Sequence, residues 1–130
     1  MTKVELALLT EKIIGAAIAV HKELGPGLLE SAYEACLRHE LMLRELRVER
    51  QKELPVIYKG ITVDCGYRID LVVEDLVIIE LKAVERIERI HEAQTISYLR
   101  LADKPVGLLM NFHVTKLVDG LRRFAHVLPK

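Results

Sequence analysis

The feature that most constrains the fold is a pair of β-rich apolar runs, residues 69–73 and 76–81, joined by an acidic turn. Short runs of valine, isoleucine and leucine on both sides of a polar turn are typical of a β-hairpin. Three charged residues interrupt this pattern: Asp70 lies in the first run, Glu80 near the end of the second, and Lys82 directly after it. The register of the hairpin decides on which face of the strand pair these charged side chains lie.

Burial of the apolar side chains predicts that register. A three-residue connection, residues 74–76, places apolar pairs on one face: Val73 with Val77, Leu71 with Ile79, and Ile69 with Leu81. The opposite face then carries Asp70, Glu80 and Lys82 together, because side chains alternate along a strand. A two-residue connection would put Asp70 opposite Ile79 and spread charge over both faces. Since a one-residue slip reverses every side chain, burial favours the three-residue connection.

The composition fits one domain with an aliphatic core. Of the 130 residues, 51% are hydrophobic but only 5% are aromatic. This length supports one sizeable core, so we expect a single domain over residues 1–130. The 19 Lys and Arg residues balance the 19 Asp and Glu residues. There is thus no overall positive field to hold nucleic acid, and such binding would depend on a local patch.

The cysteines and the hydropathy pattern indicate an intracellular chain. Cys36 and Cys65 lack the spacing of a metal motif and are predicted to be reduced and mostly buried. The N-terminus has no apolar run of signal-peptide form, and no segment approaches the roughly 18 apolar residues of a membrane span. We therefore expect a cytoplasmic protein that has no membrane partner.

Two helices are predicted before the strands. The capping-box pair Thr2 and Glu5 marks the start of the first helix, whose amphipathic stripe continues to a Gly-Pro-Gly break. The second covers about residues 28–44, and Glu30 and Tyr33 are neighbours on one of its faces because they are three positions apart. Taken alone, Glu30 is typical of an exposed acid near a helix N-terminus, and Tyr33 of a half-buried aromatic residue.

Further strands and a third helix complete the pattern. Extended segments are predicted at residues 48–51, 54–58, 61–63, 106–112 and 114–118. The third helix covers about residues 91–102. Its packed side is predicted to carry Ala93, Ile96 and Leu99. Residues 121–127 are predicted to form a short helix or tail. This order of elements predicts an α/β fold with a mixed central β-sheet flanked by helices.

The charged face of the hairpin has the residues of a metal-assisted hydrolytic site. Asp70 and Glu80 are diagonal neighbours that can share one cation, and carboxylate oxygens suit Mg²⁺ or Mn²⁺. Lys82 would lie beside a metal-bound water or a phosphate, where it could stabilise negative charge. Phosphodiester hydrolysis needs this combination of groups. The alternative is a solvent-facing ion pair between Glu80 and Lys82, which explains the spacing without a metal.

Several motifs resemble those of one nuclease superfamily. Asp70, followed on the next strand by residues 80–82 (Glu-Leu-Lys), looks like the PD-(D/E)XK signature, although Ile69 stands where the signature has proline. Residues 94–98, Gln-Thr-Ile-Ser-Tyr, resemble the Gln-x-x-x-Tyr motif of its exonuclease branch. Residues 27–33 match the GxxExxY motif of a small bacterial and archaeal family usually placed in that superfamily. The Glu-Leu-Lys-Ala-Val-Glu run at residues 80–85 and the His-Glu-Ala-Gln run at residues 91–94 also look like that family. Together these motifs resemble the family over nearly the whole chain.

The resemblance implies a restriction-endonuclease-like core and assigns roles to the charged residues of the hairpin. Asp70 and Glu80 would be ligands of Mg²⁺ or Mn²⁺, with the carbonyl oxygen of Leu81 as a third ligand. Lys82 would be the catalytic lysine of the hydrolysis.

The resemblance also implies three supporting residues and a substrate. Glu30 would be a catalytic residue that approaches the metal directly or through water. Gln94 and Tyr98 would bind substrate, contacting phosphate or fixing Glu30 and Lys82. The implied function is Mg²⁺-dependent hydrolysis of DNA, with RNA or a nucleotide as a weaker reading. The alternative is a catalytically weak or inactive nuclease-fold module for nucleic-acid or protein binding, for example as a homodimer.

Overall fold

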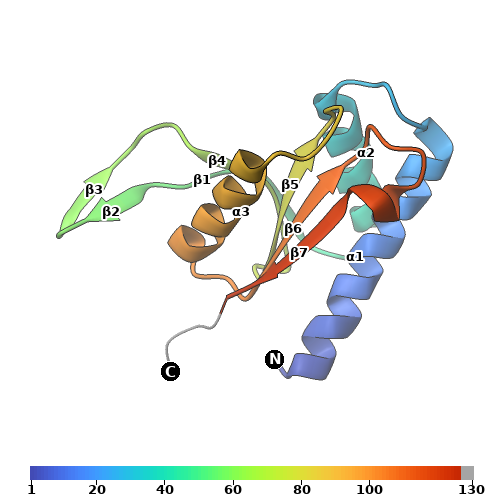
Figure 1. Cartoon of the computed structure of the whole chain (residues 1–130). Helices are drawn as coiled ribbons and strands as arrows, with labels where there is room; N and C mark the ends of the chain where they lie inside the picture. The colour runs from blue at the N-terminus through green and yellow to red at the C-terminus, as the bar shows by residue number, and fades with distance from the viewer. Residues whose placement is uncertain (127–130) are drawn as a thin grey trace.

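A five-stranded mixed β-sheet forms the centre of the computed structural model, which describes residues 1–126 (Figure 1). In the order in which they pair, its strands are β1 (Val48–Glu53), β4 (Arg68–Val73), β5 (Val77–Lys82), β6 (Val106–Asn111) and β7 (Leu121–Ala125). Only β5 and β6 pair in parallel, and the other neighbours are antiparallel. The sheet is thus mixed, as the sequence predicted.

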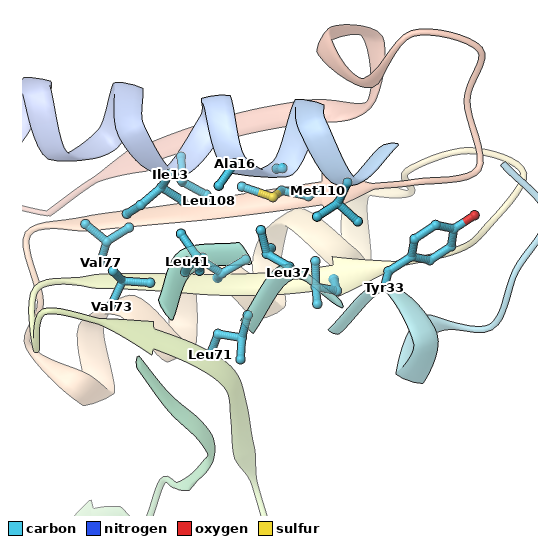
Figure 2. Packing of buried hydrophobic residues seen from close by; sticks show 14 of the residues in the cluster. Ile13, Ala16, Tyr33, Leu37, Leu41, Leu71, Val73, Val77, Leu108 and Met110 are labelled. Atoms are coloured by element: carbon cyan, nitrogen blue, oxygen red, sulfur yellow. The ribbon is translucent and has the colours of Figure 1, made fainter. Parts of the chain in front are cut away.

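Helices cover both faces of the sheet. Helices α1 (Lys3–Leu24) and α2 (Glu30–Leu43) pack on one face and α3 (Arg89–Ala102) packs on the other. The larger core lies under α1 and α2 and includes Ile13 of α1 and Leu108 of β6 (Figure 2). The predicted fold class, a mixed sheet flanked by helices, is confirmed. Among residues 1–126, no helix combines the length and apolarity needed to cross a membrane.

The predicted hairpin connection is confirmed, and two of the three predicted apolar pairs form. Val73 pairs with Val77 and Leu71 with Ile79, around a turn at residues 74–76. The ladder does not continue to a pair between Ile69 and Leu81.

Ile69 is the residue for which the predicted face was wrong. It packs against Val72 and Ile78 in the smaller cluster beneath α3, instead of joining the core under α1 and α2. The regular pairing of β4 with β5 ends at Leu71 and Ile79. Beyond this point the backbone N–H of Leu81 donates to the Asp70 carboxylate at 2.8 Å. A side chain therefore takes the place of the next backbone partner in the ladder.

Helix α3 turns a different side inward from the one predicted. Its buried residues are Thr95, Tyr98 and Leu99, whereas Ala93 and Ile96 are exposed. Apolarity alone did not identify the packed side, because the polar Thr95 can be buried when its hydroxyl donates to the carbonyl of His91 at 3.0 Å. Of the three residues predicted to be packed, only Leu99 is buried.

The end of the chain also differs from the prediction. Residues 114–118 form no strand. They bend into a short 3-10 helix, η1 (Leu117–Gly120). The segment predicted as a helix or tail, residues 121–127, instead contains β7, because its backbone pairs with the free edge of β6. Residue 127 lies outside the described residues. Cys36 and Cys65 are unpaired, as expected, but both are exposed instead of buried.

A second, two-stranded sheet connects β1 to β4. Strands β2 (Val56–Tyr58) and β3 (Ile61–Val63) form a ribbon that projects away from the main sheet, beyond α3 (Figure 1). We call this ribbon the arm. At its base, Leu54 donates a backbone hydrogen bond to the carbonyl of Tyr67, which continues the pairing of β1 with β4. Tyr67 is thereby held at the junction of the arm and the sheet.

Candidate functional site

Asp70 and Glu80 lie together at the point where β4 and β5 separate. The backbone N–H of Asp70 lies 3.4 Å from Glu80 Oε1, while the Asp70 carboxylate accepts from the N–H of Leu81. Lys82 follows at the end of β5, half-buried, and its ammonium stabilises the ionised forms of both carboxyl groups. The structure thus gathers the three charged hairpin residues in one place.

Burial disfavours negative charge on both carboxyl groups. It raises the pKa of Glu80 to about 8, with a further contribution from the neighbouring Asp70 carboxylate. The pKa of Asp70 is also raised, mainly by burial, although the hydrogen bond from Leu81 opposes this shift. A buried and a half-buried carboxyl group this close together need positive charge in order to ionise, and Lys82 supplies only part of it. Such an arrangement is typical of a functional site.

The oxygen atoms at this point fit a hard divalent cation. In a strand, the N–H and C=O of one residue point to the same side, so the carbonyl of Leu81 faces Asp70 as its N–H does. Within residues 1–126, no group of three or more His, Cys, Asp or Glu side chains is arranged to hold a metal. Mg²⁺, however, commonly binds one or two carboxylates and retains several waters. Two carboxylates and one carbonyl oxygen match that preference.

A third acidic side chain approaches the site, and it is Glu34 of α2. Its side chain is buried, and its two carboxylate oxygens accept from the guanidinium of Arg50 and the amide of Gln51. The same Gln51 amide lies 3.3 Å from Asp70 Oδ1. Gln51 therefore links the Glu34 and Asp70 carboxylates across α2, β1 and β4.

The residue that the sequence predicted for this position, Glu30, lies elsewhere. Glu30 is exposed in the first turn of α2, and no hydrogen bond or ion pair joins it to Asp70 or Glu80 in the described structure. The sequence does contain a signal for Glu34, because it shares a helical face with the buried Leu37 and Leu41. An acid within an apolar stripe is unusual and indicates a specific role.

The backbone at Gln51 is also unusual. Its φ of +50° lies in the left-handed region, which a non-glycine residue seldom adopts within a strand. Strained residues of this kind are concentrated at functional sites, where the surrounding contacts hold them in place. Nothing in the sequence indicates this conformation, because it depends on the contacts of Gln51 with Glu34 and Asp70.

Gln94 and Tyr98 of α3 lie on the Glu80 side of the site. The Gln94 amide donates to the Tyr98 hydroxyl at 3.0 Å. Burial raises the pKa of Tyr98, and the Glu80 and Asp70 carboxylates add to the shift, so the phenol is close to both. No hydrogen bond of the described residues joins Gln94 or Tyr98 to Glu30 or Lys82.

Sequence reasoning also missed Tyr67, which stands beside Tyr98. The centroids of the two rings are 5.8 Å apart and their planes are inclined at 57°. Tyr67 precedes β4 and belongs to no motif, so the sequence offers no signal for its place beside the site.

The chain matches a family model described as the PD-(D/E)XK nuclease superfamily over residues 7–124. The matched range includes every residue placed at the site above. The observed mixed sheet, with helices on both faces, is consistent with the restriction-endonuclease-like fold of that superfamily. Comparisons with curated proteins and with solved structures found no significant match.

Proposed function

The chain belongs to the PD-(D/E)XK nuclease superfamily, and we propose that it is a metal-dependent nuclease that hydrolyses phosphodiester bonds in DNA. The proposal treats residues 1–130 as one nuclease domain. The observation that carries it is the pair of carboxyl groups of Asp70, which is half-buried, and Glu80, which is buried, beside Lys82 where two strands separate. A divalent cation would stabilise the ionised forms of both carboxyl groups, which burial disfavours.

The proposed cofactor is Mg²⁺ or Mn²⁺. Asp70, Glu80 and the Leu81 carbonyl would hold it, in keeping with the oxygen ligands that these cations prefer. When bound, such a cation activates water as a nucleophile and stabilises the charge that develops on a phosphate. Lys82 would donate to a phosphate oxygen or to the attacking water, from its position two residues beyond Glu80.

The supporting roles follow from the contacts of the other site residues. We propose that Glu34 is the α2 acid that faces the metal, either directly or through water, in place of Glu30. Arg50 and Gln51 hold its two oxygens and so fix their direction. Gln94 and Tyr98 would contact the substrate from α3, because Tyr98 lies next to Glu80.

The GxxExxY motif suggests a finer placement within the superfamily, and we propose that the chain is a GxxExxY protein. Tyr33 of this motif is buried and its ring stacks on Phe112, with centroids 4.5 Å apart. Its hydroxyl donates to the carbonyl of Gly25 and accepts from the N–H of Leu28. The motif tyrosine thus fastens the connection between α1 and α2, which supports a structural reason for the pattern.

The direct test is cleavage of DNA by the purified full chain. We expect Mg²⁺ or Mn²⁺ to support cleavage and EDTA to abolish it. Asp70→Asn and Lys82→Ala should each lower the rate by about 10²–10³-fold, because each removes charge stabilisation at the reacting phosphate. Asp75→Asn is the matched control, since Asp75 is an exposed acid in the turn of the same hairpin. Equal rates for Asp70→Asn and the parent protein would contradict the proposal.

Calorimetry with Mn²⁺ separates the enzyme from the alternative function. Binding that disappears in Glu80→Gln is expected for the nuclease. Absence of binding by the folded parent protein would instead favour an inactive module of the nuclease fold, for nucleic-acid or protein binding.

A further inference from the structure

A pocket of about 450 Å³ opens between the base of the arm and α3. Tyr67 forms one side of it, while Gln94 and Tyr98 form another. Tyr67 is 43% exposed. Its hydroxyl makes no hydrogen bond with any residue from 1 to 126, so an aromatic surface is available to a ligand.

The lining of this Tyr67 pocket suits a flat, uncharged group. None of its lining side chains carries a charge, and most of its surface is apolar, including Val56, Ile90 and Leu101. Among the lining side chains, polar groups belong to Gln94, Ser97 and the two tyrosines. A phosphate would find no cation there. An aromatic ring with a polar edge would find both a stacking surface and hydrogen-bonding groups.

Tyr98 relates the pocket to the carboxylate site. This residue lines the pocket, and its phenol is close enough to Glu80 and Asp70 to sense their charge. A strand whose phosphate lies at the carboxylates would therefore have a neighbouring nucleotide at the mouth of the pocket.

We propose that the Tyr67 pocket holds one unpaired base of a DNA strand next to the bond that is cut, so that single-stranded DNA is the preferred substrate. This inference rests on the proposed nuclease function. A base in a duplex is paired and stacked and cannot enter such a pocket until it is displaced. In a single strand, stacking on tyrosine is available without that cost. The balanced charge of the chain offers no broad attraction for duplex phosphates in compensation.

Binding can be tested apart from cleavage by fluorescence anisotropy, with labelled DNA and Ca²⁺ in place of Mg²⁺. We expect the single strand to bind at least about tenfold more tightly than a blunt duplex of equal length. Tyr67→Ala should weaken single-strand binding by about tenfold, whereas Tyr67→Phe should retain it because the ring remains. Tyr58→Ala, which removes an exposed tyrosine of the arm outside the pocket, is the matched control. Tighter duplex binding, or unchanged binding by Tyr67→Ala, would overturn the proposal.

Single abasic substitutions identify the occupant as a base. In a series of oligonucleotides, one abasic position should weaken binding to the parent protein by about tenfold and have no further effect on Tyr67→Ala. If the abasic position weakened binding by the same factor in Tyr67→Ala as in the parent protein, the proposal would be overturned, because the ring and the base would then not interact. Sedimentation provides a further check. A parent protein that self-associates, together with a Tyr67→Ala variant that does not, would also overturn the proposal, because a second copy would then occupy the pocket.

The binding and cleavage experiments distinguish failure of the base pocket from failure of the nuclease function. Tyr67-dependent binding of single strands without metal-dependent cleavage would contradict the nuclease function but leave the base pocket in place. Metal-dependent cleavage with binding that is independent of Tyr67 would reject the pocket alone.

Discussion

Glu80 shows how burial controls a single residue at the site. Only 5% of it is exposed, and its carboxyl has a pKa of about 8 against an ordinary value of 4.5. Without a metal, the folded chain therefore retains a proton that the unfolded chain releases at lower pH. The protonated form also limits metal binding, because a cation must displace that proton.

This difference predicts that the metal-free protein loses stability as pH rises between about 4.5 and about 8. Stability falls with pH wherever the folded state binds more protons than the unfolded state, and the loss should be of the order of a few kcal/mol. Glu80→Gln cannot ionise and should lose most of this pH dependence. Denaturant unfolding in EDTA at several pH values measures the effect.

The control for this prediction is Glu85→Gln, which changes an exposed acid just beyond β5. It should keep the pH dependence of the parent protein. Equal pH dependence in Glu80→Gln and the parent would show that Glu80 is not the group responsible. Saturating Mg²⁺ should reverse the trend in the parent protein, because the cation binds the ionised carboxylate more tightly at higher pH.

At the scale of elements, the site depends on where strands stop pairing regularly. The ladder between β4 and β5 ends at Leu71 and Ile79, and the next hydrogen bond uses the Asp70 side chain. On the other side of β4, Gln51 of β1 adopts a left-handed conformation opposite Asp70. These two irregularities free Asp70 from ordinary sheet pairing and direct its oxygens toward neighbouring groups.

Gln51 is therefore predicted to position the carboxylates for the metal. Gln51→Ala removes the amide that links Glu34 with Asp70 and should weaken Mn²⁺ binding by about 10–100-fold, the usual effect of losing a group that orients a ligand. Calorimetry with Mn²⁺ measures the affinity, and circular dichroism confirms that the variant is folded. Glu53→Ala, an exposed change on the same strand, should bind Mn²⁺ as the parent protein does. Unchanged affinity in Gln51→Ala would exclude this positioning role.

At the scale of the whole molecule, the larger core and the arm differ in how far their apolar side chains are buried. The larger core under α1 and α2 fixes the sheet, and Leu37 and Leu41 of α2 lie within it (Figure 2). The arm, in contrast, exposes Ile57 and Ile61 and contributes little to either apolar cluster. The larger core thus lies on the face of the sheet opposite α3, and α3 lines the Tyr67 pocket.

Leu37→Ala should accordingly destabilise the protein by about 2–5 kcal/mol, because it leaves a cavity in a fully buried position. Ile57→Ala, at the exposed arm, should change stability by less than about 0.5 kcal/mol. The midpoints of urea unfolding compare the two variants. Similar losses would show that the arm belongs to the same cooperative core.

The sequence by itself determined the hairpin and the central charged residues. Alternation along two short strands, together with the need to bury one face, predicts the connection at residues 74–76 and brings Asp70, Glu80 and Lys82 together. The capping box formed by Thr2 and Glu5 is also confirmed, because its two residues are only three positions apart. These features depend on neighbours within a few residues or one turn, so local patterns suffice.

Only the tertiary structure decided which distant residues complete the site. Glu34 comes from α2, Gln51 from β1 and Tyr67 from the loop before β4. Gln51 joins Glu34 to Asp70, and Tyr67 stands beside Tyr98 of α3, because α2, β1 and α3 pack around one part of the sheet. Ile69 lies on the face opposite the predicted one for a related reason, since the Asp70 carboxylate takes the place of a backbone partner in the ladder. Such contacts arise from the packing of whole elements, and no periodicity within one segment records them.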